Sequence, residues 1–111
     1  MSHEISELED LFLDENYVEA LKVVEKALAK SPKNIGFLKQ KASLILHAPG
    51  SKFTLQDAEK CLLRAHQLAP LNLDILNDLA RFYEKDLPNP ERRDHFYNLF
   101  CSIVDRKIGE A

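Results

Sequence analysis

Cysteine, glycine and long apolar runs are scarce in this sequence, and their scarcity excludes several classes of protein. Only two cysteines and three glycines occur among 111 residues. Cys61 and Cys101 each lie within an apolar helical pattern and show no CxxC spacing, so we expect buried thiols rather than a disulfide or a redox pair. No segment approaches the roughly 20 consecutive apolar residues that span a bilayer, so membrane insertion is not expected.

The charge pattern is that of an ordinary solvated surface. The net charge is -3, and residues of both signs are interspersed along the chain. No cluster of Lys and Arg with interleaved aromatic residues is present, so nucleic acid is not an expected partner. The first residues, MSHEISELEDLF, are acidic and lack a basic stretch followed by an apolar run, so no secretory signal is visible. A reducing, cytoplasmic setting is therefore expected.

The residue types that build catalytic and metal centres are scattered. No pair of histidines stands at metal-ligand spacing among His3, His47, His66 and His95. Cys61 and His66 are five residues apart and would not share a helix face. HExxH, a nucleophile elbow and a glycine-rich phosphate loop are absent, and no two carboxylates pair in an apolar setting as a general acid and base would. We therefore expect no enzyme, no metal and no cofactor.

The stretch over residues 16–34, NYVEALKVVEKALAKSPKN, predicts one amphipathic helix. One face carries four residues at helical spacing: Ala20, Val24, Ala27 and Leu28. Two of the four are alanine, so this face is flat and lets another helix backbone approach closely. Ser31 ends the helix, because the residue before a proline is disfavoured in the α region.

The rest of the chain also has helical patterns separated by turns. Further helices are expected over residues 3–13, 34–46, 55–68, 71–85 and 91–107. Thr54 with Asp57 is a capping box that opens the helix over 55–68. Asn89 is the expected N-cap of the last helix. A Pro-Gly turn over residues 47–52 separates the helices on either side of it.

A pattern of alanine, proline and asparagine recurs along the chain after a constant interval of 38 residues (58 − 20 = 38), which we call the repeat offset. Ala58, Ala65, Pro70 and Asn72 follow Ala20, Ala27, Pro32 and Asn34 at this step. With small residues at Ala42 and Ala80 on the intervening helices, the pattern resembles the tetratricopeptide repeat family. The family period is about 34 residues, so the second repeat carries about four extra residues, which the turn over 47–52 accommodates. Phe96 lies one repeat offset after Ala58, where the family expects alanine, which suits a helix that covers the end of a stack.

The resemblance implies an all-α fold of antiparallel helical hairpins, stacked as a short right-handed solenoid. It spans a single domain, residues 1–111, with hairpins over about 3–30, 34–68 and 71–107. One hairpin cannot cover its own apolar face, so stacking buries a shared core and leaves a concave groove lined by the first helix of each pair. An irregular six-helix bundle is the alternative fold.

Members of this family bind a protein or peptide partner in that groove, as adaptors, assembly factors or chaperones. The resemblance places these residues in it: Ile5, Glu9, Phe12, Lys39, Ser43, Leu46, His47, Asn77, Arg81, Glu84 and Lys85. Apolar side chains at one end and Lys39, Arg81 and Lys85 at the other suit a partner with acidic groups beside an apolar anchor. A clamp for a C-terminal carboxylate is not expected, because Ile5 and Glu9 replace the family's Lys and Asn.

Two other functions remain open from the sequence. A small self-contained domain of this kind also suits an immunity or inhibitor protein that neutralises one toxin or enzyme. The last helix could instead support self-association as a homodimer, because it is rich in large apolar residues. The residues of that surface are Phe96, Tyr97, Phe100 and Ile103.

Overall fold

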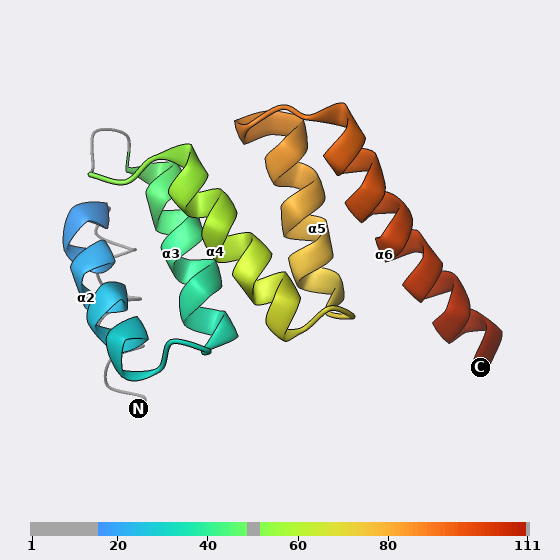
Figure 1. Cartoon of the computed structure of the whole chain (residues 1–111), viewed down its shortest axis with the longest axis horizontal. Coiled ribbons are helices and arrows are strands. Elements are labelled where there is room, and N and C mark those ends of the chain that lie inside the picture. The colour runs from blue at the N-terminus through green and yellow to red at the C-terminus, as the bar shows by residue number, and fades with distance from the viewer. Residues whose placement is uncertain (1–15, 49–51, 111) are drawn as a thin grey trace. The chain divides into compact units, whose positions relative to one another are not determined.

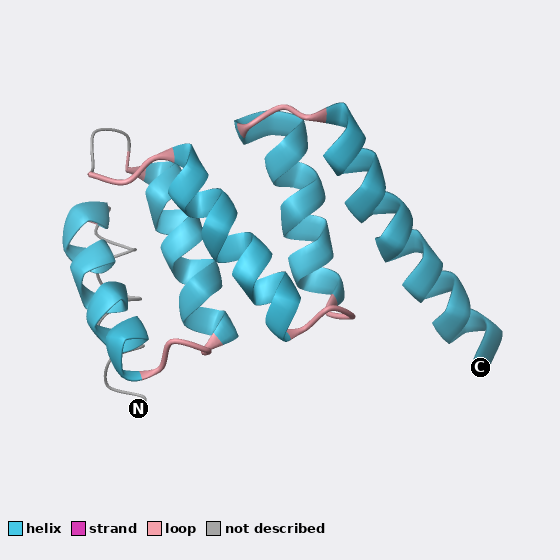
Figure 2. Cartoon of the chain, viewed as in Figure 1, coloured by secondary structure: helices cyan, strands magenta, loops and turns pink. Residues whose placement is uncertain are grey.

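A computed structural model describes residues 16–48 and 52–110, which are folded almost entirely into helices (Figures 1 and 2). The elements are α2 (Tyr17–Lys30), α3 (Ile35–His47), α4 (Leu55–Leu68), α5 (Leu73–Arg81), the π-helical turn η1 (Phe82–Asp86) and α6 (Pro90–Glu110). No strand occurs in these two ranges, so the all-α prediction is confirmed for them. The helix predicted over 3–13 and the turn residues Pro49 and Gly50 lie outside the described residues.

The chain forms two compact units, Met1–Cys61 and Leu62–Ala111, and the division falls within α4. In the first unit, α2 packs antiparallel to α3 (Figure 1). In the second, α5 and η1 pack against α6, which runs back along them. No charged or polar residue is fully buried in the described part of either unit, so aliphatic and aromatic side chains make both cores.

Side-chain caps begin the helices. An asparagine accepts a hydrogen bond from the backbone N–H three residues later at the start of four of them: Asn16 (3.3 Å), Asn34 (3.0 Å), Asn72 (3.1 Å) and Asn89 (3.1 Å). At the start of α4, the Asp57 N–H donates to Thr54 Oγ1 at 3.3 Å and the Thr54 N–H donates to Asp57 Oδ2 at 2.8 Å. The predicted capping box at Thr54 and the predicted N-cap at Asn89 are both confirmed.

The turns that follow α2 and α4 have the same hydrogen bonds, one repeat offset apart. The backbone bonds are Ser31 N–H to Ala27 O (2.9 Å) and Asn34 N–H to Ser31 O (3.0 Å) in one turn, and Ala69 N–H to Ala65 O (3.0 Å) and Asn72 N–H to Ala69 O (3.1 Å) in the other. The φ angle is -76° at both asparagines, and ψ is 110° at Asn34 and 115° at Asn72. The offset found in the sequence is therefore also an offset in backbone conformation.

Burial follows the same offset. Two buried positions of α2 and the two corresponding positions of α4 are occupied by alanine: Ala20 and Ala27 on the first helix, Ala58 and Ala65 on the second. On α6 the corresponding positions are Phe96 and Ile103, and both are buried too. Alanine lets a neighbouring helix backbone approach, whereas a large side chain fills a wider space. The three helices therefore bury the same face with different residue sizes.

The predicted helix over 71–85 differs from the observed one at its end. Regular α-helix stops at Arg81, and η1 continues as a wider turn in which the Leu87 N–H donates to Phe82 O at 3.0 Å. Pro88 has no N–H to donate, so the helical ladder cannot continue through it, and the Asn89 N–H reaches back to Tyr83 O at 2.8 Å. The last helix is longer than predicted, running from Pro90 to Glu110.

Candidate functional site

In the first unit, the predicted groove residues of α3 share one face of the helix. Lys39, Ser43, Leu46 and His47 make up this surface, the α3 stripe; His47 is exposed and the other three are half-buried. The His47 ring lies 5.5 Å from the ring of Tyr17 on α2, and its Nδ1 lies 2.8 Å from Ser43 O. A carbonyl oxygen only accepts, so Nδ1 is the donor in this contact. The α3 stripe therefore has a fixed imidazole at its C-terminal end.

In the second unit, the predicted residues of α5 and η1 also lie on one exposed face. Asn77, Arg81, Glu84 and Lys85 make up this surface, the α5 stripe, and all four are exposed. Each lies one repeat offset after its counterpart in the α3 stripe. Each stripe is brought together within its own unit. Ile5, Glu9 and Phe12, the predicted apolar end of the groove, lie outside the described residues.

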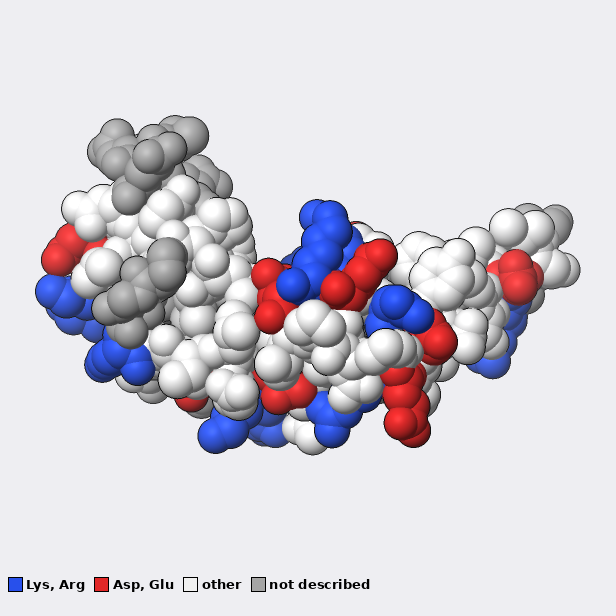
Figure 3. Space-filling model, turned by 90° about the horizontal axis from the view of Figure 1, so that it is seen from above, with Lys and Arg blue, Asp and Glu red and all other residues white. Residues whose placement is uncertain are grey.

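Charged side chains of both signs lie close together on the surface. Figure 3 shows groups on the face drawn in which Lys or Arg and Asp or Glu are neighbours. The α5 stripe has the same character, because Glu84 lies between Arg81 and Lys85 in the chain. On such a surface, charges of opposite sign lie side by side and do not add up to a field of one sign.

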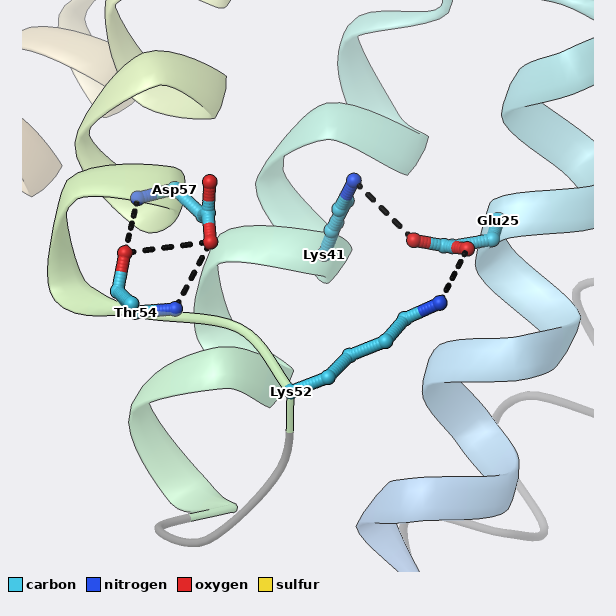
Figure 4. A network of polar contacts seen from close by, with 5 residues as sticks. All are labelled: Glu25, Lys41, Lys52, Thr54 and Asp57. Atoms are coloured by element: carbon cyan, nitrogen blue, oxygen red, sulfur yellow. Dashed lines mark hydrogen bonds and ion pairs between the residues drawn. The ribbon is translucent and has the colours of Figure 1, made fainter.

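A cluster that the sequence analysis missed joins three segments of the first unit (Figure 4). Glu25 of α2 forms ion pairs with Lys41 of α3, with Nζ to Oε1 at 3.5 Å, and with Lys52, with Nζ to Oε2 at 3.8 Å. The same two ammonium groups lie 4.6 and 5.2 Å from the centre of the Phe53 ring. Partly exposed ion pairs contribute about 0.2–1 kcal/mol each. The cluster therefore ties α2 and α3 to the segment that precedes α4.

The environment of Cys61 does not favour nucleophilic chemistry. Burial raises the pKa of the Cys61 thiol, although the nearby Lys41 ammonium acts in the opposite direction. A thiol with a raised pKa is mostly protonated near neutral pH, and the thiolate is the reactive form. Cys61 is buried as predicted, whereas Cys101 is only half-buried, and both thiols are free.

The second unit has an aromatic cluster centred on Phe96. Its ring stacks on Tyr83 at 6.0 Å and meets His66 and His95 edge to face, at 5.4 and 4.9 Å between ring centres. The Tyr83 hydroxyl accepts a hydrogen bond from Arg92 Nη1 at 3.0 Å. Tyr83 comes from η1, His66 from α4, and the other three from α6. The cluster therefore holds three segments of the second unit together.

His66 contributes a buried ring nitrogen to this cluster. Its Nδ1 is buried and has no hydrogen-bond partner in the part of the chain that the structure describes. Burial lowers the pKa of His66, and the neighbouring His95 lowers it further. The ring contacts place His95 and, across Phe96, Tyr83 with its partner Arg92 near His66. None of them offers a negative charge to a protonated His66.

We expect the fold to lose stability as the pH falls from 7.5 to 5.5. Because the folded-state pKa of His66 is lowered, the unfolded chain binds more protons below its unfolded pKa of about 6.5, and this lowers the free energy of unfolding. The stabilisation is complete above that value and is lost as the pH falls towards the folded pKa. Thermal unfolding followed by circular dichroism measures the effect.

The matched variants for this test are His66→Leu and His47→Gln. His66→Leu removes the unpaired nitrogen and should flatten the pH dependence, with little loss of stability at pH 7.5. His47→Gln, on the surface of the other unit, should keep the dependence of the wild type. If the stability of His66→Leu fell with pH as steeply as that of the wild type, groups other than His66 would be responsible for the pH dependence.

The described residues offer no metal centre and no membrane span. Within residues 16–48 and 52–110, no group of three or more His, Cys, Asp or Glu side chains is placed to hold a metal ion. Every described helix is too short or too polar to cross a membrane.

The chain matches no protein-family model, and it matches no curated protein.

Proposed function

We propose that this protein is a non-catalytic interaction module of the tetratricopeptide type, which binds protein partners through exposed helix faces, the α3 stripe in the first unit and the α5 stripe in the second. The observation that carries the proposal is the correspondence of the two stripes. They lie one repeat offset apart, on helices that begin with the same asparagine-capped turn and bury equivalent residues. A repeated exposed face on a repeated buried scaffold is the arrangement by which stacked helical hairpins present a binding surface.

The side chains of the stripes indicate the chemistry of the partner. Leu46 offers an apolar contact beside Lys39, and the α5 stripe adds the cations Arg81 and Lys85 with the amide of Asn77. Arg and Lys orient carboxylates, and Arg can do so with two parallel hydrogen bonds. The proposed ligand is an acidic segment with one apolar anchor, and the proposed setting is the cytoplasm, where free thiols such as Cys61 persist.

Charge reversal on both stripes tests the proposal. In affinity capture from a native lysate, we expect the Lys39→Glu, Arg81→Glu variant to retain at least tenfold less of the partner than the wild type does. The matched control is Lys26→Glu, Arg64→Glu, which makes the same charge change at exposed positions outside the stripes, one in each unit. The control should retain the partner at the level of the wild type.

The pattern of capture separates the possible functions. Several partners lost from the stripe variant indicate an adaptor or chaperone. One stoichiometric partner with a nanomolar Kd indicates an immunity or inhibitor protein acting through the same stripes. Equal capture by the wild type and both variants would show that the stripes are not the binding surface.

A further inference from the structure

Helix α6 carries a second apolar surface, separate from the α3 and α5 stripes. Tyr97, Cys101, Val104 and Ile108 recur at spacings of four, three and four residues and so share one face; we name them the α6 stripe. Tyr97 is 58% exposed and Ile108 is 68% exposed, and the two residues between them are half-buried. The side of α6 that packs in the unit is a different one, which carries Phe96 and Ile103.

In the first unit, the corresponding face of α2 is covered by α3. Two residues of α2 define this face by their contacts: Tyr17 reaches His47, and Glu25 pairs with Lys41. Leu21 lies midway between them on the same face and is only 3% exposed. A following helix therefore buries this side of α2.

Two steps of the repeat offset map this covered face of α2 onto the α6 stripe. They lead from Leu21 to Tyr97, and the same two steps lead from Glu25 to Cys101. The buried leucine of α2 thus corresponds to the exposed tyrosine of α6. No described helix of the second unit covers this side of α6, whereas α3 covers it on α2.

The C-terminal end of α6 has no packing partner among the described residues of the second unit. The helix has 21 residues, against 9 in α5 and 5 in η1. Figure 1 shows the C-terminal turns of α6 running past α5, and these turns carry Ile108. A few helical turns gain little stability in water without tertiary contacts. The overhang is therefore suited to binding another element.

Charges of opposite sign flank the α6 stripe. On a helical wheel, Asp94 and Asp105 lie along one edge, and Arg93 and Lys107 lie along the other. At the N-terminal end the two edges are joined by the ion pair of Arg93 Nη2 with Asp94 Oδ1, at 3.0 Å. A helix that docks on the stripe matches it best with cations along one side of its apolar face and carboxylates along the other.

We propose that the α6 stripe is the docking surface for an amphipathic α-helix of a protein partner, which packs on α6 as α3 packs on α2. The partner helix offers a large apolar residue on the side that faces α6, as α3 offers the buried Leu44 between Lys41 and His47, the two residues that contact α2. Among the described helices of a second copy, α3 is already packed on α2 and α5 on α6.

A peptide of residues 34–48 serves as the probe, because it holds the α3 helix and its Asn34 cap. Fluorescence anisotropy of the labelled peptide with the full chain should show binding with a Kd on the order of 10 μM, as a small interface gives. Leu44 lies between Lys41 and His47, which both contact α2, so a Leu44→Asp peptide should bind at least tenfold more weakly.

Matched variants of the chain place the binding on α6. Tyr97→Glu and Ile108→Glu should each weaken peptide binding at least tenfold. Ser102→Glu, which adds the same charge at an exposed position off the stripe, should leave it unchanged. The Lys39→Glu, Arg81→Glu variant should also bind the peptide normally, so failure of this proposal is distinct from failure of the α3 and α5 stripes.

Three outcomes overturn the proposal. The first is that the wild-type chain does not bind the peptide, and the second is that Ser102→Glu weakens binding as much as Tyr97→Glu. The third is a concentration-dependent dimer in sedimentation equilibrium that Tyr97→Glu dissociates, because a second copy would then occupy the stripe.

Discussion

Phe96→Ala should lower the free energy of unfolding by about 3–5 kcal/mol, the range found when a buried aromatic side chain is truncated. Phe96 is 6% exposed, and its ring is surrounded by Tyr83, His66 and His95. Removing it leaves a cavity between α6, η1 and α4, and the three remaining rings lose their common contact. Chemical denaturation followed by circular dichroism measures the change.

Tyr97→Ala is the matched control for Phe96→Ala. It removes an aromatic side chain from the next residue of the same helix, but this one is 58% exposed. A surface substitution of this kind usually changes stability by about 0.5 kcal/mol or less. If both variants lost the same amount, or if Phe96→Ala lost less than about 1 kcal/mol, the aromatic cluster would not be the centre of the second unit.

Ala27→Leu and Ala65→Leu should each lower the free energy of unfolding by about 1–3 kcal/mol, because added methyl groups overpack a close helix contact. Ala27 is 2% exposed and Ala65 is fully buried, so neither site has room for a larger side chain without movement of its neighbours. The two residues are counterparts in the repeat, so their losses should be similar. Chemical denaturation of each single variant checks this.

Ala29→Leu is the control for these overpacking variants. Ala29 lies on α2 two residues from Ala27 but is exposed, and leucine and alanine have similar helix propensities. Its stability should stay close to that of the wild type. A neutral result for Ala27→Leu and Ala65→Leu would show that alanine is not required for helix contact at the repeated positions, and the repeat interpretation would then fail.

The sequence located most helices well because their limits are set by local chemistry. The helices predicted up to Lys30 and over 55–68 are observed as α2 and α4, since proline, capping residues and apolar spacing act over a few residues. The turn at η1 was not predicted. Its geometry depends on which carbonyl oxygens accept from the N–H groups of Leu87 and Asn89, because Pro88 has no N–H to donate. The spacing of apolar residues does not indicate which oxygens these are.

Contacts between distant segments were the part that spacing could not reveal. Glu25, Lys41 and Lys52 appear as ordinary surface charges along the chain, yet three segments bring them together around Phe53. His66 likewise gave no sign that it would meet Phe96, which lies two helices further along the chain.

Candidate site residues were predictable where they share one helix. The members of the α3 stripe lie four and three residues apart, so the helical period alone places them on a common face. The homodimer surface predicted on the last helix was different, because it mixed two faces. Phe96 and Ile103 are buried in the second unit, and of the four residues of that surface only Tyr97 is exposed. Adjacent positions on a helix point about 100° apart, so one buries when the other does not.

The matching turns at Asn34 and Asn72 also make the chain modular. Both junctions have the same hydrogen bonds and nearly the same backbone angles, so a segment that starts at one asparagine and stops before the next begins and ends on compatible geometry. Tandem duplication of residues 34–71 would therefore lengthen the protein by one helical pair without creating a new kind of junction. A gene encoding this chain can gain or lose such pairs in single steps, and each step would add or remove one exposed helix face.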